Sequence, residues 1–139
     1  MSVTSTTNYK EVLATETVEK IEQIVEDNYD LEDILEFIDK NSEADFIAHY
    51  EEYVSAGENI GYDVVDTFVK YHGDMCYVVN VEDAYQGIYY DAATFAAEYY
   101  QEYYGEVTDF LVVDWDATWE SALRYDYDFI DGYVFSSNF

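Results

Sequence analysis

The spacing of apolar residues along the chain changes near residue 73, and the two halves predict different kinds of structure. In the first half apolar residues recur at intervals of three and four, which is the pattern of amphipathic helices. Asp30 and Ser42 suit the N-cap positions of two helices, and Gly57 and Gly73 are expected to end two helices. No proline interrupts the pattern. We therefore expect a small helical bundle with helices at residues 9–27, 31–40, 43–56 and 62–72.

The buried face of each helix follows from the same spacing. In the helix at residues 31–40, Leu31, Ile34, Leu35 and Ile38 are expected to point inward, so the acids between them face water. The helix at residues 9–27 is expected to bury a stripe made of Ala14, Val18, Ile21 and Val25, widened by Leu13 and Ile24.

The second half mixes strands and helices. Residues 84–90 read as a strand, and a hairpin is expected around Asp131 and Gly132. Asp91 and Asp114 suit the first positions of two helices, at residues 91–104 and 114–123. Residues 76–81 fit either a short strand or a helical turn, and residues 107–113 form a connector of undecided type. The predicted fold class is α+β, with a helical bundle at residues 1–73 and a C-terminal domain at residues 74–139 in which a short antiparallel sheet packs with two or three helices.

The net charge of −27 is the dominant property of the composition. Residues 1–72 hold 18 acids and four lysines, a charge of −14, while residues 73–139 hold 14 acids and one arginine, a charge of −13. Because half of the residues are apolar, the chain has material for a core and is not expected to be disordered. Like-charge repulsion excludes binding to nucleic acids and to anionic membranes, and it favours a strongly basic partner. The plainer alternative is a halophilic or merely very soluble protein.

The charge density invites comparison with duplex DNA. B-DNA carries one charge per roughly 1.7 Å of axis, so 27 charges correspond to about 46 Å of duplex. A compact chain of 139 residues has a diameter of about 37 Å, which gives a comparable linear density. Like charges in rows weaken their own helices by a few tenths of a kcal/mol per pair, so the rows call for a functional reason. We expect the charge field to be formed by Glu19, Glu22, Glu26, Glu32, Asp33, Glu36, Asp39, Glu51, Glu52, Asp63, Asp66, Asp91, Glu98, Glu102, Asp116 and Glu120.

No pattern predicts catalysis, a cofactor or a metal ion. His49 and His72 stand without a second histidine or cysteine at ligand spacing, and the acidic neighbours of Cys76 should raise the pKa of its thiol. The acids from Asp126 onward resemble the start of a calcium-binding EF-hand loop, but Ser137 stands where the bidentate glutamate is required. One cysteine, no signal peptide and no long apolar run predict a protein of the reducing cytoplasm.

Five short motifs in residues 42–139 resemble the ArdA-type antirestriction proteins. They are Gly61-Tyr62-Asp63-Val64-Val65-Asp66, Asp83-Ala84-Tyr85-Gln86-Gly87, Asp91 with Phe95-Ala96, Asp114-Trp115-Asp116-Ala117-Thr118, and Asp131-Gly132-Tyr133-Val134-Phe135. The resemblance implies a phage- or mobile-element-encoded mimic of B-form DNA that occupies the DNA-binding groove of host type I restriction–modification enzymes. It also implies an elongated molecule that pairs through its C-terminal domain.

The antirestriction motif of that family maps onto residues 111–123. The resemblance therefore implies a homodimer contact through Leu111, Val113, Trp115, Trp119 and Tyr133. The chain departs from the family in two places, because helices replace the family's N-terminal β-containing domain and Trp119 stands where a small residue is usual. The alternative is an acidic binder or mimic directed at another basic target, such as a CRISPR effector, another DNA-binding protein or a histone-like protein.

Overall fold

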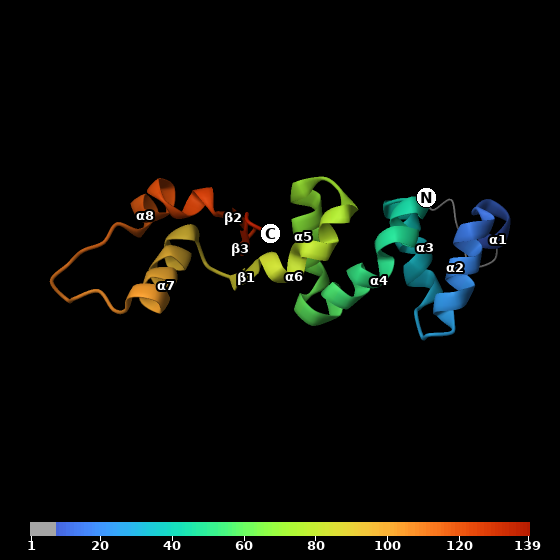
Figure 1. Ribbon diagram of the computed structural model, residues 1–139, viewed down its shortest axis with the longest axis horizontal. Coiled ribbons are helices and arrows are strands. Elements are labelled where there is room, and N and C mark those ends of the chain that lie inside the picture. The colour runs from blue at the N-terminus through green and yellow to red at the C-terminus, as the bar shows by residue number, and fades with distance from the viewer. Residues whose placement is uncertain (1–7) are drawn as a thin grey trace.

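The computed structural model describes residues 8–139 and has the elements of the chain arranged roughly in a row (Figure 1). Five helices form the N-terminal part: α1 (Tyr9–Val12), α2 (Thr15–Val25), α3 (Leu31–Lys40), α4 (Glu43–Ile60) and α5 (Tyr62–His72). Helices α7 and α8 lie at the opposite end of the elongated molecule from α1 and α2. The predicted class, a mostly helical α+β fold with helices first and a sheet later, is confirmed.

The C-terminal part begins with helical turns and carries a small sheet. Its elements are η1 (Met75–Asn80), α6 (Val81–Ala84), β1 (Tyr85–Ile88), α7 (Ala92–Tyr104), α8 (Trp115–Ser121), η2 (Leu123–Tyr125), β2 (Tyr127–Ile130) and β3 (Tyr133–Ser136). Residues 76–81 are thus helical rather than extended. The three strands are antiparallel in the order β1-β3-β2. Asp131 (φ 51°) and Gly132 (φ 89°) both adopt positive φ, as the tight two-residue turn between β2 and β3 requires.

Four helices begin with the side-chain caps that the sequence predicts. In each case the cap oxygen accepts a hydrogen bond from the backbone N–H three residues on, which satisfies an otherwise unpaired donor of the first turn. The pairs are Asp30 with Asp33 (3.2 Å), Ser42 with Asp45 (3.0 Å), Asp91 with Thr94 (2.7 Å) and Asp114 with Ala117 (3.0 Å).

The single helix predicted for residues 9–27 is wrong, because the chain breaks at Leu13 and Ala14. Both residues have extended backbone, and the N–H of Ala14 donates to Glu43 Oε1 at 2.9 Å instead of to a helical carbonyl. The break also rotates the buried face. Leu13, Ile21 and Ile24 are buried as expected, and Thr17 is buried with them, whereas Ala14 and Val25 are exposed.

The predicted end of the third helix at Gly57 is also wrong. Helix α4 runs through Gly57 to Ile60 and ends at Gly61, whose φ is +103°. Gly57 is buried, and a β-carbon placed there would lie 2.3 Å from Cε1 of Tyr62. This glycine therefore serves the close approach of a tyrosine ring rather than the termination of a helix.

Two hydrophobic clusters form the core, and strand β3 takes part in both. The larger cluster joins the N-terminal helices to η1, α6 and Phe135, whereas the smaller one contains Phe95, Ala96, Leu123 and Val134. Val134 and Phe135 are fully buried neighbours whose side chains point to opposite faces of the strand, one into each cluster. The larger cluster extends across residue 73, and the division into domains at that residue stays a prediction.

Candidate interaction surface

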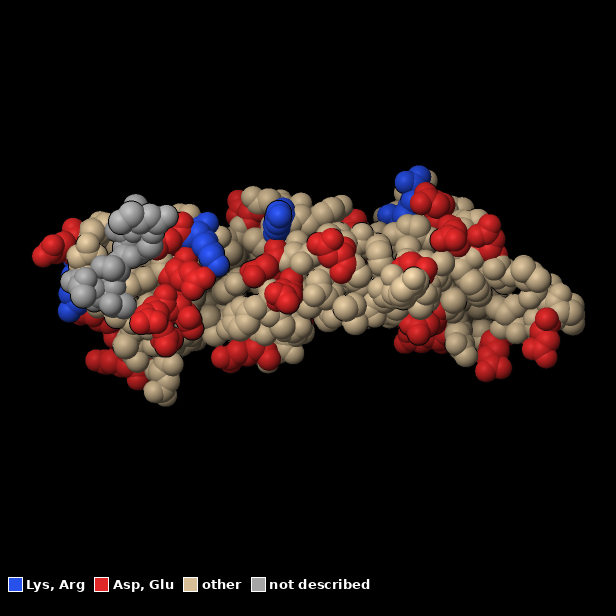
Figure 2. Space-filling view, turned by 180° about the vertical axis from the view of Figure 1, so that it is seen from behind, with Lys and Arg blue, Asp and Glu red and all other residues tan. Residues whose placement is uncertain are grey.

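The carboxylates predicted to form the charge field lie at the surface. All sixteen are exposed except Asp91, which is half-buried because it caps α7. Figure 2 shows acidic side chains distributed along the whole length of the visible face, with basic side chains at only a few places. No single element gathers them, since they come from α2 and the residue after it, from α3, α4, α5, α7 and α8, and from the cap of α7.

Ion pairing neutralises only a small part of this charge. The chain has 32 acids and five bases. Within residues 8–139, four of the bases form ion pairs. These pairs are Lys10–Glu22 (3.6 Å), Lys20–Glu51, Lys40–Glu36 (2.7 Å) and Arg124–Glu120 (3.4 Å). Exposed pairs of this kind contribute about 0–1 kcal/mol each, so they add little to the stability of the fold.

A few acids have structural roles of their own. Hydrogen bonds from the Thr94 hydroxyl and backbone lower the pKa of the Asp91 carboxyl, and the backbone N–H of Cys76 lowers the pKa of Asp74. Asp66 accepts a 2.7 Å hydrogen bond from the hydroxyl of Tyr53. These hydrogen bonds hold the three carboxylates in defined positions.

Further acids share the exposure of the predicted set but were not included in it. They are Glu11, Glu16, Asp27, Asp30, Glu58, Asp74, Glu82, Asp83, Glu106, Asp109, Asp114, Asp126 and Asp131. In the sequence, these acids can be identified only by their place on the outer face of a predicted helix, at its end or in a loop. The exposed acids are thus spread over the surface more evenly than the sixteen predicted carboxylates alone would suggest.

The residues predicted to form a dimer contact are not gathered in one place. Trp115 and Trp119 are half-buried against the smaller cluster, whereas Tyr133 packs on the larger one. Val113 is half-buried, and Leu111 is 57% exposed. Leu111 lies in the loop that follows α7, and its two neighbours, Phe110 and Val112, are 86% and 99% exposed.

The two histidines and the single cysteine come from α4, α5 and η1. His49 and His72 are half-buried, and the ring of His72 stacks on Tyr77 with centroids 4.7 Å apart. Cys76 is exposed, and its hydrogen bond with the Asp74 carboxylate raises the pKa of its thiol. Within residues 8–139, no group of three or more His, Cys, Asp and Glu side chains is arranged to hold a metal ion. In the same range, no helix has both the length and the apolar character that a membrane crossing needs.

Comparison of the chain with protein-family models, with curated proteins and with solved structures gave no match. The resemblance to ArdA-type proteins therefore stays a prediction from the short motifs.

Proposed function

We propose that this protein is a non-enzymatic mimic of DNA that inhibits host type I restriction–modification enzymes by occupying their DNA-binding groove. The observation that carries the proposal is the even spread of exposed carboxylates along an elongated molecule (Figure 2). A protein groove built for duplex DNA carries lysine and arginine side chains placed to meet phosphates along its length. Rows of carboxylates fixed on helices offer those side chains the same charge at many points.

The mechanism is competitive occupation. Each basic side chain of the target that meets a carboxylate releases counterions, which makes binding strong at low salt and steeply weaker at high salt. No cofactor takes part, and the protein itself binds neither nucleic acid nor membrane because its charge repels both. The place of action is the cytoplasm of the host cell, where restriction enzymes meet incoming DNA.

A shared charge field predicts a particular response to charge reversal. We expect the triple variant Glu32→Lys, Asp33→Lys, Glu36→Lys on α3 to weaken inhibition of a type I enzyme by tenfold or more, and each single variant to change it less than threefold. The triple variant Glu98→Lys, Glu102→Lys, Glu120→Lys at the other end of the molecule should weaken it to a similar extent. Circular dichroism checks that each variant is folded. Complete loss from one single reversal would indicate a discrete site and would contradict the proposal.

We further propose that two copies pair through the exposed loop that holds Leu111. Phe110, Leu111 and Val112 are three consecutive apolar side chains exposed to water, which is unfavourable. Contact with a second copy of the protein would bury them. Sedimentation velocity at micromolar concentration should detect a dimer that the Leu111→Asp variant converts to monomer. Val79→Asp is the matched control, because Val79 is 53% exposed and lies outside the loop. A monomeric wild-type protein would contradict this pairing.

A further inference from the structure

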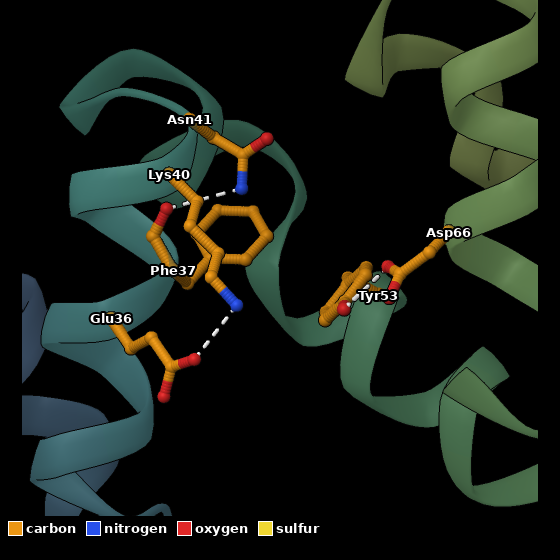
Figure 3. Close-up of polar contacts among 6 residues, drawn as sticks. All are labelled: Glu36, Phe37, Lys40, Asn41, Tyr53 and Asp66. Atoms are coloured by element: carbon orange, nitrogen blue, oxygen red, sulfur yellow. Dashed lines mark hydrogen bonds and ion pairs between the residues drawn. The ribbon is translucent and has the colours of Figure 1, made fainter. Parts of the chain in front are cut away.

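A cleft of about 820 Å³ opens between helices α3, α4 and α5 (Figure 3), and two of its lining residues, Tyr62 and Asp66, belong to the motif at residues 61–66. Helix α3 contributes Glu36, Phe37 and Lys40 to one wall. Tyr53 of α4 and Asp66 of α5 face them across the opening. A cleft of this volume matches the size of sites that take small organic groups.

The lining of the cleft includes a group of four aromatic side chains, from Phe37, Tyr50, Tyr53 and Tyr62. The centroid of the Phe37 ring lies 5.0 Å from that of Tyr50 and 5.1 Å from that of Tyr53, and the Tyr53 ring lies 5.5 Å from that of Tyr62. Phe37 and Tyr50 are buried, whereas Tyr62 is 41% exposed. The rings of Phe37 and Tyr50 are therefore held in place by packing, whereas the ring of Tyr62 is partly open to solvent.

The polar groups of the cleft are held in defined positions. The hydroxyl of Tyr53 donates to Asp66 Oδ1 at 2.7 Å, which fixes a carboxylate beside the aromatic wall. On the opposite wall, Lys40 Nζ lies 2.7 Å from Glu36 Oε1, so an ammonium group of the chain itself is already present in the cleft. The hydrogen bond and charge of Glu36, with a smaller contribution from Asp66, raise the pKa of Lys40. The local field thus favours positive charge.

We infer that this cleft binds an organic cation, a guanidinium or ammonium group carried on an alkyl chain. The electron-rich faces of aromatic rings attract such a cation, and Asp33 and Asp66 supply carboxylates for charge-assisted hydrogen bonds. Imitation of phosphate charge does not require aromatic side chains. The aromatic rings of the cleft therefore add recognition of the ligand's shape to the diffuse negative charge of the surface. The cation has two sources: a basic side chain of a bound protein, which rests on the proposed function, or a free polyamine, which does not.

The test uses the full-length protein alone, titrated with N-acetyl-arginine amide and with spermidine and followed by NMR of the tyrosine ring resonances. Both ligands should shift the resonances of Tyr53 and Tyr62, and magnesium chloride at equal charge should not. The variant Asp33→Asn, Asp66→Asn should bind at least tenfold more weakly. The variant Glu19→Gln, Glu26→Gln removes the same charge outside the cleft and should change the affinity less than twofold.

Lys40 and Lys70 both line the cleft, and Lys40 gives a second and opposite test. Lys40→Met removes a competing ammonium group, so the affinity for both ligands should rise severalfold. Lys10→Met removes a lysine that is ion-paired with Glu22 far from the cleft, and it should have a much smaller effect. Tighter binding of the arginine amide assigns the cleft to a protein side chain, and tighter binding of spermidine assigns it to a polyamine.

The inference would be overturned if the two double variants weakened ligand binding equally, or if the tyrosine resonances did not shift. Either result would mean that the cations are attracted only by the overall negative charge of the protein. Because no target protein is present, either result is separate from the fate of the proposed inhibition.

Discussion

Replacement of a helical glycine by alanine usually stabilises a protein. At Gly57 we expect one close contact to cancel or reverse that gain in stability. In the interior of a helix, alanine is more favourable than glycine by about 0.8–1.0 kcal/mol, and Gly57 lies inside α4. Here, however, the added β-carbon would lie 2.3 Å from Cε1 and 2.4 Å from Cδ1 of Tyr62. The helix-propensity gain therefore competes with a steric cost that depends on one side chain.

The size of that cost follows from what the ring can do. If the Tyr62 ring stays, overpacking costs typically 1–3 kcal/mol. If the ring, 41% exposed, swings into solvent, it loses its contact with Tyr53 at 5.5 Å, and such aromatic pairs contribute about 0.5–1.5 kcal/mol. We expect Gly57→Ala to leave the wild-type protein unchanged or less stable by up to about 2 kcal/mol. In a Tyr62→Ala background the same substitution should stabilise by about 1 kcal/mol.

Urea unfolding of the four proteins of this double-mutant cycle measures the difference directly. The coupling between the two positions should be about 0.5–3 kcal/mol, with Tyr62 making Gly57→Ala unfavourable. Equal stabilisation by Gly57→Ala in both backgrounds would refute the close approach of the ring to α4. It would also remove Tyr62 from the wall of the α3–α5 cleft.

Two further predictions concern the electrostatics of the fold. Because hydrogen bonds from Thr94 lower the pKa of Asp91, its stabilising effect should be complete above the unfolded-state pKa of about 3.9 and should vanish as the pH falls through the lower folded-state value. The urea midpoints of wild type and Asp91→Ala should accordingly differ at pH 6 and converge below about pH 4, while a constant gap would contradict the cap. Sodium chloride should raise the melting temperature, since the Debye length shortens from about 30 Å at 0.01 M to about 3 Å at 1 M and repulsion among the carboxylates is screened. A melting temperature that falls with salt would show that the ion pairs outweigh the repulsion.

The sequence predicts best those features that depend on neighbouring residues. The caps at Asp30, Ser42, Asp91 and Asp114 were correct because each requires only a short polar side chain and a backbone N–H three residues away. The exposure of the acids was predictable for a similar reason, since helical spacing alone separates them from the apolar face.

The features that the sequence did not predict depend on distant contacts. The break at Ala14 is stabilised by Glu43, and the role of Gly57 is set by a ring of the next helix. The α3–α5 cleft requires Phe37, Tyr53 and Asp66 to meet, and only the crossing of three helices brings them together. Neither helical periodicity nor charge counting contains that information.

The central claim is that this protein and duplex DNA compete for the same groove. A purified type I restriction–modification enzyme bound to a fluorescent duplex with its recognition sequence provides the assay, with the protein added at fixed salt concentration. We expect complete displacement of the duplex, and the concentration of protein needed for half displacement should rise in proportion to the concentration of free duplex. A stable complex that holds enzyme, duplex and protein together, or no displacement at low salt, would contradict mimicry of DNA.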